Sequence, residues 1–222
     1  MSVLRLVVFD LDGTLIDSRR DLAESANEML AGYGAPALPV EQVTDMVGEG
    51  ARLLVQRSCA AAGLAPVPDD ALTRFLAAYD RRLFDHTRPY DGVVAMLRAL
   101  ALHVRLAVLT NKPQPPAERL VKGFGFAPHV TSVIGGDAGY PRKPAPEGLL
   151  ALVARARVTP AETLMVGDSW IDVETAERAG TGFCLARYGF GVARMPAGSL
   201  AAPALGIDAA RDLVPIVLGA VP

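Results

Sequence analysis

The sequence predicts an α/β protein in which a doubly wound parallel sheet carries a small α-helical domain inserted after the first strand. The chain has 222 residues, of which 51% are hydrophobic. This length exceeds the ~150 residues typical of one domain, and the chain can bury a substantial core. Short apolar runs alternate with helical patterns over most of the chain, which favours parallel strands joined by crossover helices. Residues 18–88 break that alternation and contain helical patterns only.

The predicted strands are short apolar runs bounded by acidic residues, glycine or other turn residues, which is typical of strands buried on both faces of a parallel sheet. They are Val3–Phe9, Val104–Leu109, Val130–Ile134, Leu164–Val166 and Phe183–Ala186. Helical patterns lie between most of them, over Val93–Leu102, Pro116–Phe124, Glu147–Ala156 and Val173–Ala179. In such a sheet, ligands bind at the carboxyl ends of the strands.

The interrupting stretch predicts four helices. Asp17 or Ser18 can cap the first, which runs to about Tyr33 and ends at glycines. The other three are expected over Val40–Val47, Ala51–Ala62 and Asp69–Phe84. We therefore expect two domains, an α/β core of residues 1–17 and 89–222 and a helical cap of residues 18–88.

Composition and charge exclude several classes of protein. Lys and Arg number 22 and Asp and Glu 24, giving a formal net charge of −2 without a long basic run, so we expect no nucleic-acid partner. No uninterrupted apolar run of about 18 residues occurs, and Met1–Asp10 does not resemble a secretory leader, so we expect no membrane partner. Cys59 and Cys184 form no CxxC motif, which favours two reduced, buried thiols. We expect a cytoplasmic monomer or homodimer that acts on a small molecule.

The strongest local signal is the segment Asp10-Leu11-Asp12-Gly13-Thr14, directly after the first strand. Two carboxylates spaced i and i+2 leave a strand end on the same side, and Gly13 allows a tight turn beside whatever they bind. Paired carboxylates suit a hard divalent cation, and a carboxylate can also attack phosphorus. Taken alone, the segment could equally be an acidic loop that caps the next helix.

Three further groups of polar residues follow later apolar runs. Thr110 and Asn111 close the second predicted strand, where hydroxyl, amide and N–H groups can hold phosphate oxygens, although a Thr-Asn pair is also an ordinary turn. Lys143 is one of three lysines, and an isolated lysine is usually a surface group. Asp168 and Asp172 share one side if a helix begins near Ser169, or they serve as a cap and a first-turn carboxylate.

Together these residues resemble the four motifs of the haloacid dehalogenase superfamily of phosphohydrolases. Phe9–Leu15 matches the first motif, DxDx[TV], and Leu109-Thr110-Asn111 matches the second, a Ser or Thr that closes a later strand. Lys143-Pro144 matches the third motif, a lysine ahead of a helix, and Gly167–Asp172 matches the acidic fourth. The resemblance implies a Rossmann-like core and spans most of the chain.

The resemblance also implies a mechanism. Asp10 would attack phosphorus, and Asp12 would protonate the leaving oxygen and then deprotonate the hydrolytic water. Mg²⁺ would be bound by Asp10, by the backbone carbonyl of Asp12 and by Asp168, with Asp172 orienting these ligands. Lys143 would neutralise the phosphate and keep Asp10 ionised.

The remaining implied roles concern the substrate. Thr14, Thr110 and Asn111, together with Lys143, would bind the phosphate group. An insert at this place in the chain resembles the helical cap (C1) subclass, in which the cap presents specificity residues. We expect these to be Gly48, Gly50 and Arg52, although Gly48–Gly50 could be a plain helix end.

The resemblance extends more softly to phosphoglycolate phosphatases, over Val47–Arg57 and Val133–Pro146. We therefore expect a Mg²⁺-dependent phosphomonoester hydrolase acting on 2-phosphoglycolate, a small phosphorylated substrate. Because Lys143 is committed to the phosphate, the cation for the substrate carboxylate is expected from the cap. Arg52 is the candidate, with loop N–H groups as its alternative.

Other functions stay open at this point. A sugar phosphate, pyrophosphate or a nucleoside monophosphate could be the substrate, and a β-phosphoglucomutase would share all four motifs. Asp12 disfavours a dehalogenase, and the absence of lysine from residues 18–88 disfavours a phosphonoacetaldehyde hydrolase. A catalytically silent relative that binds a metal or a partner protein is the alternative outside the enzymes.

Overall fold

The structure is a computed structural model that describes residues 4–196 and 205–219. The chain forms two compact units, Met1–Asp17 with Pro89–Pro222, and Ser18–Arg88. We call them the core unit and the helical unit. Among the described residues, no helix is long and apolar enough to cross a membrane. Both cysteines, Cys59 and Cys184, are buried and free.

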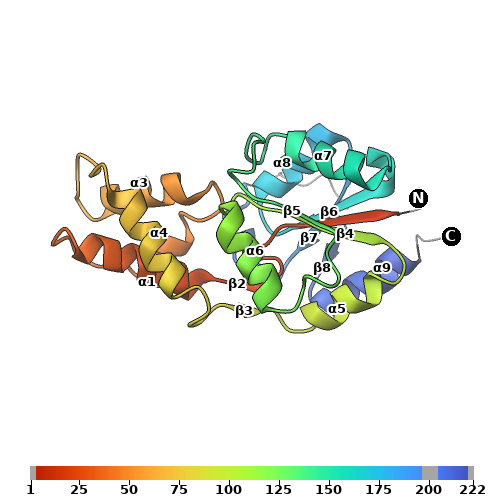
Figure 1. Ribbon diagram of the computed structural model, residues 1–222, viewed down its shortest axis with the longest axis horizontal. Helices are drawn as coiled ribbons and strands as arrows, with labels where there is room; N and C mark the ends of the chain where they lie inside the picture. The colour runs from red at the N-terminus through yellow and green to blue at the C-terminus, as the bar shows by residue number, and fades with distance from the viewer. Residues whose placement is uncertain (1–3, 197–204, 220–222) are drawn as a thin grey trace. The chain divides into compact units, whose positions relative to one another are not determined.

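The core unit is built on a six-stranded sheet in the order β5-β4-β1-β6-β7-β8, in which all neighbours are parallel (Figure 1). The strands are β1 (Leu6–Phe9), β4 (Arg105–Leu109), β5 (Ser132–Ile134), β6 (Thr163–Gly167), β7 (Gly182–Ala186) and β8 (Gly206–Ile207). Every residue of β1 and β6 is buried, as expected of central strands covered on both faces.

Helices cover both faces of this sheet. In Figure 1, α7 (Glu147–Ala156) and α8 (Trp170–Ala179) lie on one face, and α5 (Val93–Leu100) and α9 (Leu213–Leu218) lie on the other. The helix α6 (Gln114–Gly123) packs against β5. Three short 3-10 helices, Pro160–Glu162, Val192–Arg194 and Ala210–Asp212, complete the described elements of the unit.

The helical unit contains the four expected helices. They are α1 (Arg19–Ala31), α2 (Val40–Thr44), α3 (Ala51–Ala61) and α4 (Ala71–Arg81). Apolar residues at helical spacing are buried along α1, among them Leu22, Ala26 and Met29. On α4, the rings of Phe75 and Tyr79 are stacked with centroids 6.1 Å apart. The unit is therefore stabilised by the apolar faces that the sequence periodicity predicts.

The predicted fold class is confirmed, with corrections at the ends of the elements. The first strand begins at Leu6, and Val3 lies outside the described residues. The strand expected from Val130 begins at Ser132, and the helix expected from Val173 already begins at Trp170. We did not predict α9 or β8, since a two-residue strand such as β8 carries no periodicity.

A purely helical stretch from Ser18 to Arg88 was also wrong at its end. Arg88 opens the short strand β3 (Arg88–Pro89), which pairs with β2 (Ile16–Asp17) in a separate two-stranded sheet. These strands are too short to be recognised from alternating hydrophobicity.

Candidate active site

The polar segments singled out in the sequence follow three neighbouring strands. Asp10 follows β1, Thr110 follows β4 and Asp168 follows β6, and β1 lies between the other two strands in the sheet. The chain leaves β1 toward β4 and β5 on one side and returns to β6 on the other. This reversal is the switch point at which doubly wound sheets bind ligands, because the flanking loops separate there.

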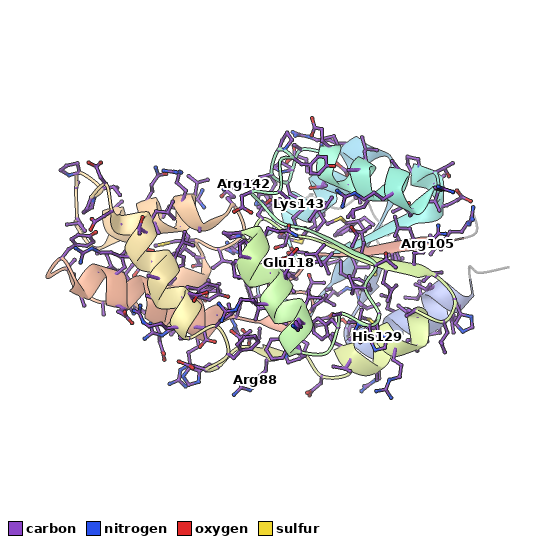
Figure 2. The ribbon with its side chains drawn as sticks, viewed as in Figure 1. Arg88, Arg105, Glu118, His129, Arg142 and Lys143 are labelled. Carbon is purple, nitrogen blue, oxygen red and sulfur yellow. The ribbon has the colours of Figure 1, made fainter. Side chains whose placement is uncertain are left out.

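Lys143 joins two of the carboxylates. Its Nζ lies 2.8 Å from Asp10 Oδ1 and 2.6 Å from Asp172 Oδ1, and its side chain is 3% exposed. It lies on the segment between β5 and α7, and Figure 2 shows it toward one end of the sheet and Arg105, which opens β4, toward the other. The motif lysine is therefore buried among the acidic groups rather than solvated.

Asp172 is held on both of its oxygens. Oδ1 accepts a hydrogen bond from Lys143, and Oδ2 accepts bonds from the N–H (3.1 Å) and the hydroxyl (2.6 Å) of Ser169. Its place in the first turn of α8 favours a negative charge. With both oxygens engaged, Asp172 is suited to position its neighbours.

Asp10, Asp168 and Asp172 form a buried acidic cluster in which one carboxylate oxygen from each residue lies within 4.8 Å of the others. Burial, together with repulsion from Asp10 and Asp172, holds the pKa of Asp168 well above its usual range. An all-oxygen set of crowded carboxylates is the donor set that a hard divalent cation prefers. A cation here would offset the repulsion that raises these pKa values, so the residues fit a metal.

The pKa of Asp10 corrects one expectation. Burial raises it to about 7, against the attraction of Lys143 and with added repulsion from Asp172 and Asp12. Lys143 lowers the pKa as expected, but burial outweighs it. Burial also disfavours the charge on Lys143, yet Asp10 and Asp172 attract it strongly enough to raise the pKa of the ammonium group.

Asp12 has a partner that the sequence analysis did not assign. The Nζ of Lys112 lies 2.9 Å from Asp12 Oδ2, and the lysine side chain is 4% exposed. The signal was present in the sequence, since Lys112 directly follows the motif pair Thr110-Asn111 at the end of a predicted strand. Two lysines thus divide the carboxylates of the first motif between them.

Thr110 and Asn111 support this arrangement. Both are buried, and the backbone N–H of Lys112 donates to Thr110 Oγ1 at 3.2 Å. The side-chain amide of Asn111 donates to the backbone carbonyl of Lys143 at 2.9 Å. These bonds tie the loop after β4 to the segment that carries Lys143. Their expected contacts with a phosphate group stay a prediction.

The first motif packs closely against Asp168. Gly13 has φ of +92°, and a Cβ there would overlap the Asp168 carboxylate, so only glycine fits at this position. Thr14 is completely buried, and no described residue hydrogen-bonds to its Oγ1. Its carbonyl accepts a hydrogen bond from the Tyr188 hydroxyl at 3.0 Å. This environment suits support of the loop better than the phosphate binding that we expected of Thr14.

A second group missed in the sequence is the segment Tyr188-Gly189-Phe190-Gly191, which follows β7. The N–H of Gly191 donates to Asp168 Oδ2 at 2.7 Å. A Cβ on Gly189 would overlap both the Asp168 side chain and the Gly13 carbonyl. The glycines therefore let this loop pack directly against Asp168 and the first motif.

The expected specificity residues belong to the helical unit. Gly48 and Gly50 have φ of +123° and +93° and lie between α2 and α3. Arg52 is exposed in the first turn of α3. Glu49 forms an ion pair with Arg57 at 2.6 Å, which connects the loop to the same helix. The role of these residues in substrate recognition stays a prediction.

Fold and site together define a hydrolase with an aspartate at a sheet switch point, and the comparison with protein families agrees. The model of the haloacid dehalogenase-like hydrolases matches residues 4–180. The chain belongs to this family, and the resemblance seen in the four motifs is confirmed.

Similar proteins narrow the comparison. The chain is 43% identical to the phosphoglycolate phosphatase of Rhodospirillum rubrum over 210 residues, covering 90% of this chain and 86% of that protein. It is 38% identical to phosphoglycolate phosphatase 1 of Pseudomonas aeruginosa, covering 95% and 79%. A solved structure from Haemophilus somnus, described as a predicted phosphoglycolate phosphatase, has a TM-score of 0.90 at 31% identity and covers 97% of this chain and 99% of that one.

Proposed function

We propose that this chain is a Mg²⁺-dependent phosphomonoester hydrolase that converts 2-phosphoglycolate to glycolate and phosphate. The observation that carries the proposal is the meeting of Asp10, Lys143 and Asp168 at the carboxyl ends of adjacent central strands. A nucleophile, a buried cation and a cation-binding carboxylate are the components that phosphoryl transfer to an aspartate requires.

In the first half of the reaction, an oxygen of Asp10 attacks phosphorus while the bond from phosphorus to the ester oxygen breaks. Asp12 donates a proton to that leaving oxygen. The Lys143 ammonium, 2.8 Å from Asp10 Oδ1, orients the nucleophile and attracts the phosphate. The product of this step is an aspartyl phosphate on Asp10 and a free alcohol.

In the second half, Asp12 accepts a proton from the water that attacks the phosphorus of the aspartyl phosphate. The Asp10 carboxylate leaves, and phosphate is released. One residue can serve both steps because it is ionised after giving up its proton in the first. Lys112, 2.9 Å from Asp12 Oδ2, fixes the side chain in place for both steps.

The acidic cluster is proposed to hold the Mg²⁺. Asp10 and Asp168 would bind it with their carboxylates and Asp12 with its backbone carbonyl, while Asp172 holds Lys143 in place. When bound, the ion supplies positive charge that offsets the repulsion between the phosphate and Asp10. Gly191, through its bond to Asp168 Oδ2, directs the Oδ1 oxygen of that carboxylate to the ion.

The choice of phosphoglycolate is supported by the relatives that carry this activity in their names, at 38–43% identity over most of their length. For the helical unit we propose the role of a specificity cap. Its support is its inserted position in the chain, between β2 and β3.

Phosphate release from a panel of esters tests the proposal. The panel contains phosphoglycolate, a hexose phosphate, pyrophosphate and a nucleoside monophosphate, each with Mg²⁺ and with a chelator. We expect phosphoglycolate to give the highest kcat/KM and the chelator to abolish release. A higher kcat/KM for another ester would overturn the substrate, and no release from any ester would make the chain a silent relative.

A further inference from the structure

Lys112 is a buried cation placed beside the proposed acid of the reaction. The residue is 7% exposed, and its ammonium lies 2.9 Å from Asp12 Oδ2. Lys143, the other buried lysine, contacts Asp10 and Asp172 instead. The core unit therefore has one buried ammonium at the nucleophile and another at the acid.

Under the proposed function, on which this inference rests, Asp12 contacts the ester oxygen of the leaving group. In phosphoglycolate a single methylene joins that oxygen to the carboxylate carbon, which brings the carboxylate oxygens within about 3 Å of the ester oxygen. A cation in contact with Asp12 therefore lies within reach of the substrate carboxylate. The transferred phosphate lies on the other side of the ester oxygen, toward Asp10 and Lys143.

The geometry points to Lys112 as the residue that recognises the carboxylate of the leaving group. One ammonium has three donors, so Lys112 can keep its contact with Asp12 and donate to the substrate carboxylate at the same time. In a buried site this charge-assisted bond favours a leaving group with an anion next to the ester oxygen over a neutral one. Lys112 is then a specificity residue of the core unit.

This changes the expectation from the sequence that the helical unit must supply the cation. That expectation assumed that Lys143 was the only committed lysine and assigned the carboxylate to Arg52. Arg52 is exposed on α3, whereas Lys112 is buried next to Asp12. A buried ammonium binds a carboxylate more strongly than an exposed guanidinium, because water screens it less.

The test compares two substrates that differ in the carboxylate, phosphoglycolate and 2-hydroxyethyl phosphate. We expect Lys112→Met to lower the ratio of their kcat/KM values by about 10- to 100-fold, the effect of one charge-assisted hydrogen bond. Lys112→Arg keeps the charge and should retain more of the ratio than Lys112→Met. The matched control is Lys122→Met, an exposed lysine on α6, which should leave the ratio unchanged.

Lys112→Gln provides a second variant if Lys112→Met does not fold. It retains a donor for Asp12 but not the charge, and we expect it to lower the ratio in the same direction. Binding gives a readout without turnover, since 3-phosphonopropionate and propylphosphonate form a non-hydrolysable pair with and without the carboxylate. Lys112→Gln should weaken the binding of 3-phosphonopropionate by about tenfold more than that of propylphosphonate.

Equal losses on both substrates would overturn the inference, because Lys112 would then act only through Asp12. A fall of the ratio in Arg52→Met but not in Lys112→Met would return the carboxylate to the helical unit. These outcomes differ from a failure of the proposed function, in which the unaltered protein would not hydrolyse phosphoglycolate at all.

Discussion

Each of the two units buries carboxylates, but it surrounds them differently. In the helical unit, Asp21 is fully buried on α1, and its oxygens accept hydrogen bonds from the N–H groups of His86 and Thr87 and from the Thr87 hydroxyl, at 2.6–3.1 Å. In the core unit, Asp10 and Asp168 lie beside further carboxylates. Asp21 is thus satisfied by neutral donors, whereas the core carboxylates repel one another.

Proximity of acidic groups does not distinguish the two places. Asp21, Glu24 and His86 also have ligand atoms within 4.8 Å of one another, as the core cluster does. Glu24, however, pairs with Arg20 at 2.8 Å, and Asp21 joins α1 to the segment after α4. The difference teaches that the number of donors available to each buried carboxylate separates a structural tie from a cation site.

The sharpest way to break this comparison is to remove one carboxylate charge in each unit. Asp10→Asn should lower phosphate release by at least about 10³-fold, because no other nucleophile is in place. Asp21→Asn should lower the free energy of unfolding by about 1–3 kcal/mol, since buried donors lose their acceptor, with turnover changed only a few-fold. Steady-state kinetics and urea unfolding of both variants check this, and the reverse pattern would contradict the assignment of the two carboxylates.

The loop after β7 should be the next most sensitive part of the site. A methyl group at Gly189 would overlap Asp168 and the Gly13 carbonyl, so Gly189→Ala should shift both. We expect turnover to fall by about 100-fold, comparable with the loss of a group that orients a metal ligand. Gly139→Ala is the control, because a Cβ there meets no atom within 4 Å. Equal behaviour of the two alanine variants would remove the loop from the site.

The carboxylates of the core cluster should differ among themselves. Asp168→Ala should raise the Mg²⁺ concentration needed for half-maximal activity more than Asp172→Ala, which should raise it by about 10- to 100-fold. The reason is that both oxygens of Asp172 are engaged by Lys143 and Ser169. Calorimetric titration of Mg²⁺ into each variant measures the same order without turnover, and equal losses would make Asp172 a direct ligand.

The pH dependence of stability gives the smallest expected effect. The pKa of Asp10 is about 7 in the folded chain against an ordinary value of 3.8. Between these values the folded state holds a proton that the unfolded state has released. Raising the pH from about 4 to about 7 therefore lowers the free energy of unfolding of the metal-free protein.

Asp10→Asn removes this contribution. Its stability relative to the unaltered protein should increase between about pH 5 and about pH 8, by up to about 4 kcal/mol in the presence of a chelator. Urea unfolding at both pH values measures the difference. A difference that is constant with pH would mean that the carboxylate of Asp10 is not destabilised by its burial.

The predictable part of the site is the part encoded locally. Asp10, Thr110 and Asp168 follow apolar runs that are themselves evident, and α/β proteins bind ligands where parallel strands end. The same runs predicted the central strands within a few residues. Where an element has only two residues, as in β2, β3 and β8, no period exists to be recognised.

The contacts that were missed depend on tertiary structure. Lys112 meets Asp12 because β1 and β4 are neighbours in the sheet, in the register that pairs Phe9 with Val108. Tyr188 reaches Thr14 because the loop after β7 packs against the first motif. Neither partner is near in sequence, so hydrophobic periodicity carries no information about these pairs.

Formation of an aspartyl phosphate on Asp10 is the central claim, and the Asp12→Asn variant with 4-nitrophenyl phosphate tests it most directly. Nitrophenolate is a good leaving group that needs no proton from residue 12, whereas hydrolysis of the aspartyl phosphate still needs the base. We predict a burst of one nitrophenolate per active site and one phosphoryl group on the acid-quenched peptide that contains Asp10. Steady turnover without a burst, with Asp10 unmodified, would contradict the account.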